Sequence, residues 1–205
     1  ITPEKIYKNR RSFIKSIGLG ASSLAISTIP FANKSLANER DKLTSYKDIT
    51  TYNNYYEFGT SKGDPYRNSQ IFKTSPWDIS IEGEVEKPIK LSMEEISEMF
   101  VSEERIYRLR CVEGWSMVIP WMGFSLSELL SKVNPTNKAK FVEFESVYDP
   151  AQMKGQRYPV LNWPYNEGLR IDEAMHPLTT VVTGLYGKKL PNQNGAPFRI
   201  FIPWK

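Results

Sequence analysis

The chain has 205 residues, of which 40% are hydrophobic and 24% are charged, with 14 Pro and 12 Gly. This composition is typical of a globular protein with one domain of ordinary size, and it excludes disordered, collagen-like and coiled-coil chains. The formal net charge is +4, but residues 1–37 hold six Lys and Arg residues against Glu4 alone, so the remainder has no cationic excess. Because duplex binding needs cations that displace phosphate counterions, we expect no nucleic-acid partner.

Residues 1–37 have the organisation of an export signal. Arg10 and Arg11 precede an uncharged stretch at 16–33 that is rich in Ser, Gly and Ala, and the small residues Ser35 and Ala37 predict cleavage after Ala37. A membrane anchor is the alternative, but polar residues and a proline interrupt the stretch. The arginine pair resembles a twin-arginine signal, an address read by a receptor. We therefore expect export by the twin-arginine machinery to the periplasm, a route that by resemblance carries folded, often cofactor-loaded proteins.

Cysteine and histidine counts narrow the choice of cofactor. The chain has one Cys, Cys111, and one His, His176. A single cysteine cannot form an intrachain disulfide, and one cysteine with one histidine cannot build the usual zinc, copper or haem sites. The sequence also contains no phosphate-binding or dinucleotide-binding glycine motif. Cys111 has three open interpretations: an inert core group, a nucleophile, or the one protein ligand of a cofactor-held metal. A catalytic Cys/His pair is the weakest of these, because His176 stands in a His-Pro pair that suits a structural role.

Residues 38–70 are polar and lack helical or strand periodicity beyond a few residues. Their six aromatic side chains are too many for a solvated tail. We expect an extended N-terminal arm packed on a domain at 71–205, and a disordered linker is the alternative.

Two helix starts in the domain share one pattern. Ser92 and Ser125 are each followed three residues later by Glu, so each serine is expected to cap a short helix whose Glu bonds back to it. Asn134-Pro135 is expected to end the second helix.

Strands are expected where apolar residues alternate or β-branched and aromatic residues gather, at 77–85, 105–111, 140–148, 179–183 and 198–202. Residues 159–168 are expected to form a loop and 169–175 one or two helical turns. Strands and short helices alternate without regular β-α-β spacing, which predicts an α+β fold of mixed sheets. The strongly strand-like run at 198–202 stands so near the last residue that we expect a chain truncated at the C-terminus, with the domain incomplete.

Four segments carry a resemblance to a known family. They lie at 52–59, 104–121, 173–178 and 193–199. In this order they resemble the catalytic subunits of protein-methionine-sulfoxide reductases, which are periplasmic molybdopterin enzymes of the sulfite oxidase fold family. The resemblance implies a sulfite oxidase-like fold, a Mo-molybdopterin cofactor, and reduction of methionine sulfoxide in oxidised periplasmic proteins as a form of protein repair. It also implies a haem-containing membrane subunit as electron donor.

The resemblance assigns a role to each matching residue. Cys111 matches the thiolate that binds molybdenum, whose other sulfur ligands come from the pterin. Asn54 and Glu113 match polar catalytic groups beside the metal. Residues that match positions holding the pterin and its phosphate are Asn53, Tyr56, Glu57, Ser146, Asn194 and Arg199. The planar guanidinium of Arg199 suits phosphate oxygens chemically.

The residues after Cys111 depart from those of sulfite-oxidising relatives, which typically show an Asn and paired Arg suited to an anion. We therefore expect a site without strong cations that takes a neutral sulfoxide. If the strand continues past Cys111, Glu113 shares its face. Two alternatives stay open: sulfite oxidase-like oxygen transfer in the oxidising direction, and a cofactor-free exported binding module in which Cys111 only packs.

Overall fold

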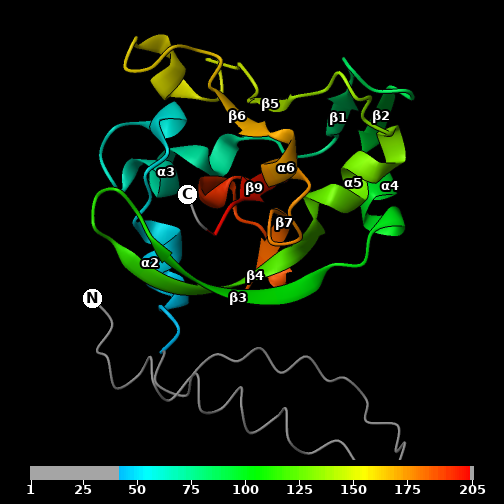
Figure 1. Ribbon diagram of the computed structural model, residues 1–205. Helices are drawn as coiled ribbons and strands as arrows, with labels where there is room; N and C mark the ends of the chain where they lie inside the picture. The colour runs from blue at the N-terminus through cyan, green and yellow to red at the C-terminus, as the bar shows by residue number, and fades with distance from the viewer. Residues whose placement is uncertain (1–41, 204–205) are drawn as a thin grey trace, which may run out of the picture. The chain divides into compact units, whose positions relative to one another are not determined.

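The computed structural model describes residues 42–203, which belong to one compact unit (Figure 1). The expected signal at 1–37 and the first residues of the expected arm lie outside the described residues. Between 42 and 203, no helix has the length and hydropathy needed to cross a membrane.

The largest sheet has five strands and is built around β7 (Thr180–Leu185). One edge of β7 pairs with β4 (Ser116–Ser125), which in turn pairs with β3 (Glu103–Arg110). The other edge pairs with β8 (Lys188–Lys189) and β9 (Arg199–Phe201). All these pairings are antiparallel, and Figure 1 shows β3 and β4 as long curved ribbons beneath β7 and β9.

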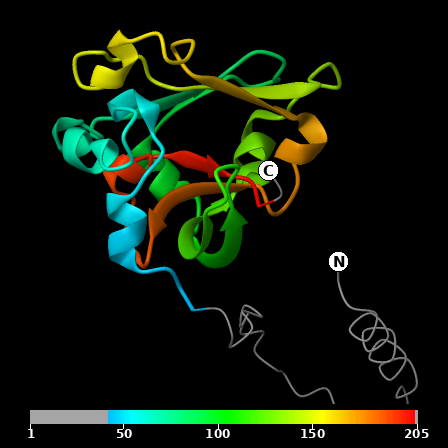
Figure 2. The same cartoon turned by 90° about the vertical axis from the view of Figure 1, so that its left-hand side faces the viewer.

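Two antiparallel ribbons complete the strands. β1 (Asp78–Ile81) pairs with β2 (Ile89–Ser92), and β5 (Phe141–Glu145) pairs with β6 (Asn166–Arg170). In both views the β5–β6 ribbon lies on the opposite side of the molecule from β3 and β4 (Figures 1 and 2). Three sheets interspersed with short helices agree with the expected α+β class.

The helix α4 (Met93–Met99) begins as its sequence predicts. The Ser92 hydroxyl accepts a hydrogen bond from the Glu95 amide at 3.1 Å, and the Glu95 carboxylate accepts one from the Ser92 amide at 2.8 Å. This reciprocal pair satisfies two amides that the first turn leaves without helical partners.

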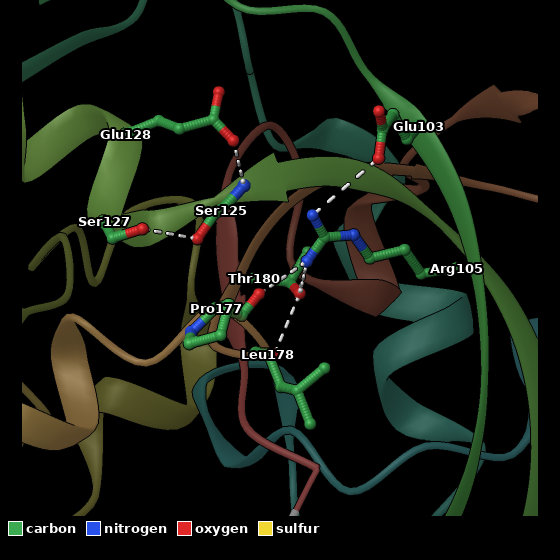
Figure 3. Close-up of polar contacts among 8 residues, drawn as sticks. All are labelled: Glu103, Arg105, Ser125, Ser127, Glu128, Pro177, Leu178 and Thr180. Carbon is green, nitrogen blue, oxygen red and sulfur yellow. Dashed lines mark hydrogen bonds and ion pairs between the residues drawn. The ribbon is translucent and has the colours of Figure 1, made fainter. Parts of the chain in front are cut away.

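The helix α5 (Leu126–Val133) begins at its predicted cap, Ser125. The Glu128 carboxylate accepts a hydrogen bond from the Ser125 amide at 3.4 Å, and the hydroxyls of Ser125 and Ser127 lie 2.8 Å apart (Figure 3). Asn134 ends the helix in the left-handed conformation at φ 50°, which Asn tolerates better than most residues.

The core contains two large clusters of buried apolar side chains. The first joins α4 and α5 to β4, β6 and β7, and includes Ile96, Phe100, Phe124, Leu126, Leu129, Leu130, Leu169 and Val181. Within it, the rings of Phe100 and Phe124 stack at 4.3 Å. The second joins α2 (Tyr46–Thr51) to β4, β7 and β9, and includes Ile49, Ile119, Trp121, Val182, Leu185 and Phe201. Each fully buried side chain of this size contributes roughly 1.5–3 kcal/mol.

Arg105 ties β3 across β4 to the segment that leads into β7. Its Nη1 atom donates to the Pro177 carbonyl at 3.0 Å and to the Thr180 hydroxyl at 3.2 Å, and Glu103 lies 3.9 Å from Nη2 (Figure 3). The guanidinium thereby fixes the strand that leads to Cys111.

The expected extended conformation of residues 38–70 is wrong for the part that the structure describes. That part forms four short helices: α2, η1 (Tyr56–Phe58), α3 (Asp64–Asn68) and η2 (Ser69–Ile71). Helices of three to six residues are too short to show a helical period in the sequence. Ile49 and Phe58 are buried, so the segment packs on the domain.

Several features of the domain also differ from the expectations. β4 was not predicted, because it contains Pro120 and its apolar run is half-buried or buried on both faces, which removes the alternation. β6 begins inside the expected loop at 159–168, and only Ile171–Ala174 (α6) forms a helix in the expected helical stretch. β3 ends at Arg110, so Cys111 does not continue the strand.

Candidate active site

Cys111 opens the hairpin turn between β3 and β4. Its amide donates to the Trp115 carbonyl at 2.9 Å, and its carbonyl accepts from the Gly114 amide at 2.9 Å. Gly114 adopts φ 83°, so the three residues after Cys111 form a tight turn whose last residue needs glycine. Both bonds use the backbone, which leaves the half-buried thiol available for a ligand.

Glu113 lies in this turn, so the expectation that it shares a strand face with Cys111 is wrong. Its carboxylate accepts a hydrogen bond from Lys62 Nζ at 2.8 Å, and the same ammonium donates to the Asn54 amide oxygen at 2.9 Å. The two predicted polar groups are therefore joined through a lysine that the sequence analysis missed. Lys62 lies three residues beyond the matching segment 52–59, but nothing in the sequence pattern links it to Glu113.

Asn53 and Asn194 converge on the end of α2. Both side-chain amides donate to the Ile49 carbonyl, at 2.8 and 3.0 Å. Asn194 belongs to η4 (Asn192–Asn194), whose Gln193 donates to the Thr50 carbonyl at 2.9 Å. The Oδ1 atoms of both asparagines are buried and without a hydrogen-bond partner among the described residues. A buried acceptor left unpaired costs free energy, so this pair of oxygens is suited to a bound donor.

Arg199 stands beside this pair at the start of β9. Its Nη1 atom donates to the Asn194 carbonyl at 2.9 Å, and its guanidinium lies 5.2 Å from the Trp121 ring centre. It forms no ion pair with a side chain in the range 42–203. Burial lowers the pKa of Arg199, although an arginine keeps its charge. A partly desolvated cation without a carboxylate is suited to an anionic group such as phosphate.

Tyr56 and Glu57 lie in η1, against η3 (Lys154–Arg157). A Cβ atom at Gly155 would stand 1.9 Å from the Tyr56 carbonyl oxygen, so only glycine allows this approach. Burial raises the pKa of Glu57. Burial also raises the pKa of Tyr55, with Glu57 adding to the rise and Arg199 opposing it, so these three groups are close enough to interact electrostatically.

Ser146 is the predicted residue least connected to the others. It follows β5, and its amide donates to the Tyr165 carbonyl at 2.9 Å. Its neighbour Val147 packs against the small cluster around Phe58. The structure therefore brings η1, η4 and β9 together, and Lys62 links the Cys111 turn to them. Ser146 is near η1 only because the neighbouring Val147 packs against the cluster around Phe58.

The polar groups and the thiol of this site fit a molybdopterin cofactor. Two orphaned amide oxygens suit N–H donors of a pterin, the Arg199 guanidinium suits a phosphate, and the lone thiol suits a soft metal. Within 42–203, no group of three or more Cys, His, Asp or Glu side chains is placed to hold a metal ion. A metal at Cys111 would therefore need further ligands from the cofactor.

The comparisons with known proteins agree with this fit. The family of oxidoreductase molybdopterin binding domains matches residues 66–205. The chain is 50% identical to the protein-methionine-sulfoxide reductase catalytic subunit MsrP of Xanthomonas axonopodis pv. citri and 48% identical to that of Burkholderia mallei. The whole chain is covered in both cases, as are 68% and 67% of those proteins.

The chain belongs to the MsrP family of molybdopterin-binding oxidoreductases. The crystal structure of sulfane dehydrogenase SoxCD from Paracoccus pantotrophus is also similar, with a TM-score of 0.52 at 14% identity over 88% of this chain and 55% of that one. Likeness at this identity concerns the fold alone, and it agrees with the expected sulfite oxidase-like fold. The expected Mo-molybdopterin cofactor is confirmed by the MsrP family.

Proposed function

We propose that this MsrP-family chain reduces methionine sulfoxide residues in proteins with a Mo-molybdopterin cofactor. One observation carries the proposal. A tight turn presents the half-buried thiol of Cys111, and Lys62 joins Glu113 of the same turn to the segment that holds Asn53 and Asn54. The similar MsrP proteins, which bear this activity in their name, support the assignment.

The protein's part in the reaction is to hold the cofactor and to arrange polar groups around it. When bound, molybdenum supplies two electrons, so that a sulfoxide and two protons become a thioether and water. Cys111 would supply the thiolate ligand, Asn53 and Asn194 would offer acceptors to the pterin, and Arg199 would neutralise the phosphate. Fixed groups of this kind need no reorganisation during the reaction.

The expectation of a site without strong cations needs correction, because Lys62 lies among the predicted polar groups. Its ammonium forms an ion pair with Glu113 at 2.8 Å, so this part of the site carries a balanced pair of charges. A balanced pair attracts sulfite less than the paired arginines of sulfite-oxidising relatives do, and it leaves a neutral sulfoxide unaffected.

The cellular setting is part of the proposal. The arginine pair at positions 10 and 11 supports twin-arginine export to the periplasm, where oxidised proteins are the substrate for repair. Electrons come from a haem-containing membrane subunit. These statements depend on the sequence motif and on the resemblance of the chain to its family.

A two-substrate assay tests the proposed reaction. The complete, molybdenum-loaded protein is given a methionine-sulfoxide peptide with a reduced dye as donor, and separately sulfite with an oxidised acceptor. We expect turnover of the peptide to be the faster of the two. Faster turnover of sulfite would favour the oxidising alternative, and a folded protein that holds no molybdenum would favour the binding module.

A further inference from the structure

Lys62 connects the two sides of the site through its side chain. Its ammonium has three N–H donors, and two of them bond to Glu113 Oε1 at 2.8 Å and Asn54 Oδ1 at 2.9 Å. Glu113 belongs to the turn that begins at Cys111, and Asn54 belongs to the segment between α2 and η1. One cation therefore joins groups that stand 59 residues apart in the chain.

Aromatic rings restrict the same ammonium. Its nitrogen lies 5.4 Å from the ring centre of Trp115 and 5.7 Å from that of Tyr56, within the range of a cation–π attraction. The Trp115 ring also contacts Tyr52 at 4.8 Å. The side chains of Lys62 and Glu113 are 23% and 34% exposed, so the pair is partly open to water and its geometry depends on the neighbouring rings and hydrogen bonds.

The backbone around Lys62 is fixed as well. Its carbonyl accepts a hydrogen bond from the Asn53 amide at 2.9 Å. Two residues later, Asp64 accepts from the Ser61 amide at 2.9 Å through Oδ2, and its own amide donates to the Ser61 carbonyl at 2.9 Å. The lysine is thus held at its backbone by a predicted cofactor residue and at its side chain by two predicted catalytic groups.

We propose that Lys62 is a positioning residue, which holds Glu113 and Asn54 in one arrangement relative to the Cys111 turn. The tip of this turn is otherwise open to solvent, since Val112 between Cys111 and Glu113 is fully exposed. Losing the ammonium releases a carboxylate in the turn that carries the metal ligand. The inference rests on the proposed function, because it concerns the same site.

Lys62→Met tests this role, because Met keeps most of the stem length and removes the charge and the donors. Lys73→Met is the matched control, since Lys73 is exposed and its side chain forms no hydrogen bond or ion pair with residues 42–203. The complete, loaded proteins are compared by molybdenum content, by the electron paramagnetic resonance spectrum of the Mo(V) state, and by kcat and KM for a sulfoxide peptide. The spectrum reports the surroundings of the metal without any turnover.

We expect Lys62→Met to retain molybdenum, to change the Mo(V) spectrum and to lower kcat about tenfold or more, with a smaller change in KM. Lys73→Met should match the parent in all measurements. A parental spectrum and kcat in Lys62→Met would overturn the proposal, and so would loss of molybdenum from a folded variant, because that result assigns Lys62 to cofactor retention.

Glu113→Gln provides the second variant, because it breaks the ion pair from the other side and keeps the side-chain size. It should change the Mo(V) spectrum in a folded, loaded protein, and an unchanged spectrum would overturn the proposal even if Lys62→Met fails to fold. A parent enzyme that does not reduce sulfoxides would contradict the proposed function alone, since the spectral comparison still decides the role of Lys62.

Discussion

The two hydrogen bonds that close the turn at Cys111 do not use its thiol. The bonds to Trp115 and Gly114 use the backbone of Cys111, so Cys111→Ser should keep the fold and the melting temperature. Serine is a much poorer ligand for a soft metal, so turnover should fall to near zero and the Mo(V) spectrum of the loaded protein should change. Activity assays, the Mo(V) spectrum and thermal unfolding check the parts of this prediction.

Val112→Ala is the matched control for Cys111→Ser. Val112 is the neighbouring residue and is fully exposed, so its truncation should leave the metal content at the parental value. Retained turnover in Cys111→Ser would exclude Cys111 as the metal ligand.

Glu57 gives a pH dependence whose sign follows from burial. Its side chain is 5% exposed, and burial raises its pKa above the ordinary 4.5. The folded protein therefore holds this proton to higher pH than the unfolded chain does. As pH rises above about 4.5 through the raised pKa, the folded state loses stability relative to the unfolded state, and the loss persists above that window.

Glu57→Gln removes this titration and keeps the side-chain shape. In the cofactor-free protein, the variant should gain stability relative to the parent as pH rises from 4.5 towards neutrality. Urea unfolding at several pH values measures the difference, with the exposed Glu82→Gln as control. A difference that does not change with pH would contradict the prediction.

Among the elements, η1 and η3 depend on one glycine. A Cβ atom at Gly155 would meet the Tyr56 carbonyl oxygen at 1.9 Å and the Glu57 carbonyl oxygen at 2.8 Å. Both atoms are backbone, so η1 must move to relieve the overlap. Gly155→Ala should lower the free energy of unfolding by about 3 kcal/mol and reduce cofactor content, because η1 carries two predicted cofactor residues.

Gly168→Ala separates this close approach from a general effect of alanine. The nearest atom to its added Cβ is the Val142 carbonyl oxygen at 4.0 Å, which is an ordinary contact. Its free energy of unfolding should change by less than about 1 kcal/mol. Equal losses in the two variants, measured by urea unfolding, would show that η1 and η3 tolerate the side chain.

Elements that depend on local sequence were predictable. The caps at Ser92 and Ser125 each require only a Glu three residues later, and both helices begin there. β4 was not predictable from periodicity, because Pro120 stands within it and its buried run does not alternate. The Pro120 carbonyl accepts a hydrogen bond from the Tyr186 amide, just beyond the first residue pair between β4 and β7. The nitrogen of a strand residue points to the same side as its carbonyl, so the Pro120 nitrogen faces the end of the β4–β7 pairing, where a missing N–H is tolerated.

At the scale of the whole molecule, the candidate site depends on pairings between distant segments. Asn53 and Asn194 meet at the Ile49 carbonyl, although 141 residues separate them in the chain. Only resemblance to a family indicated that these positions belong to one site. Lys62 was missed because its partner Glu113 lies 51 residues away, a separation over which sequence spacing carries no information.

This assembly also bears on the order of folding and export. Cofactor contacts proposed at Asn53, Asn194 and Arg199 exist together only after α2, η4 and β9 have packed, so the cofactor can be held only by a folded chain. This requirement agrees with an export route that carries proteins already folded. The twin-arginine signal proposed at Arg10 and Arg11 supplies such a route.

Replacing Arg10 and Arg11 together by Lys tests this route. Lysine keeps the positive charge and removes the guanidinium pair, so a receptor that reads arginines should fail while a charge-dependent signal should not. We expect the precursor to stay in the cytoplasm with its molybdenum bound, as measured by fractionation and metal analysis. Lys8→Arg, which alters a nearby cation and leaves the pair intact, should be exported normally. Normal export of the double variant would exclude the twin-arginine route. A general export signal or a membrane anchor would then be the favoured interpretation.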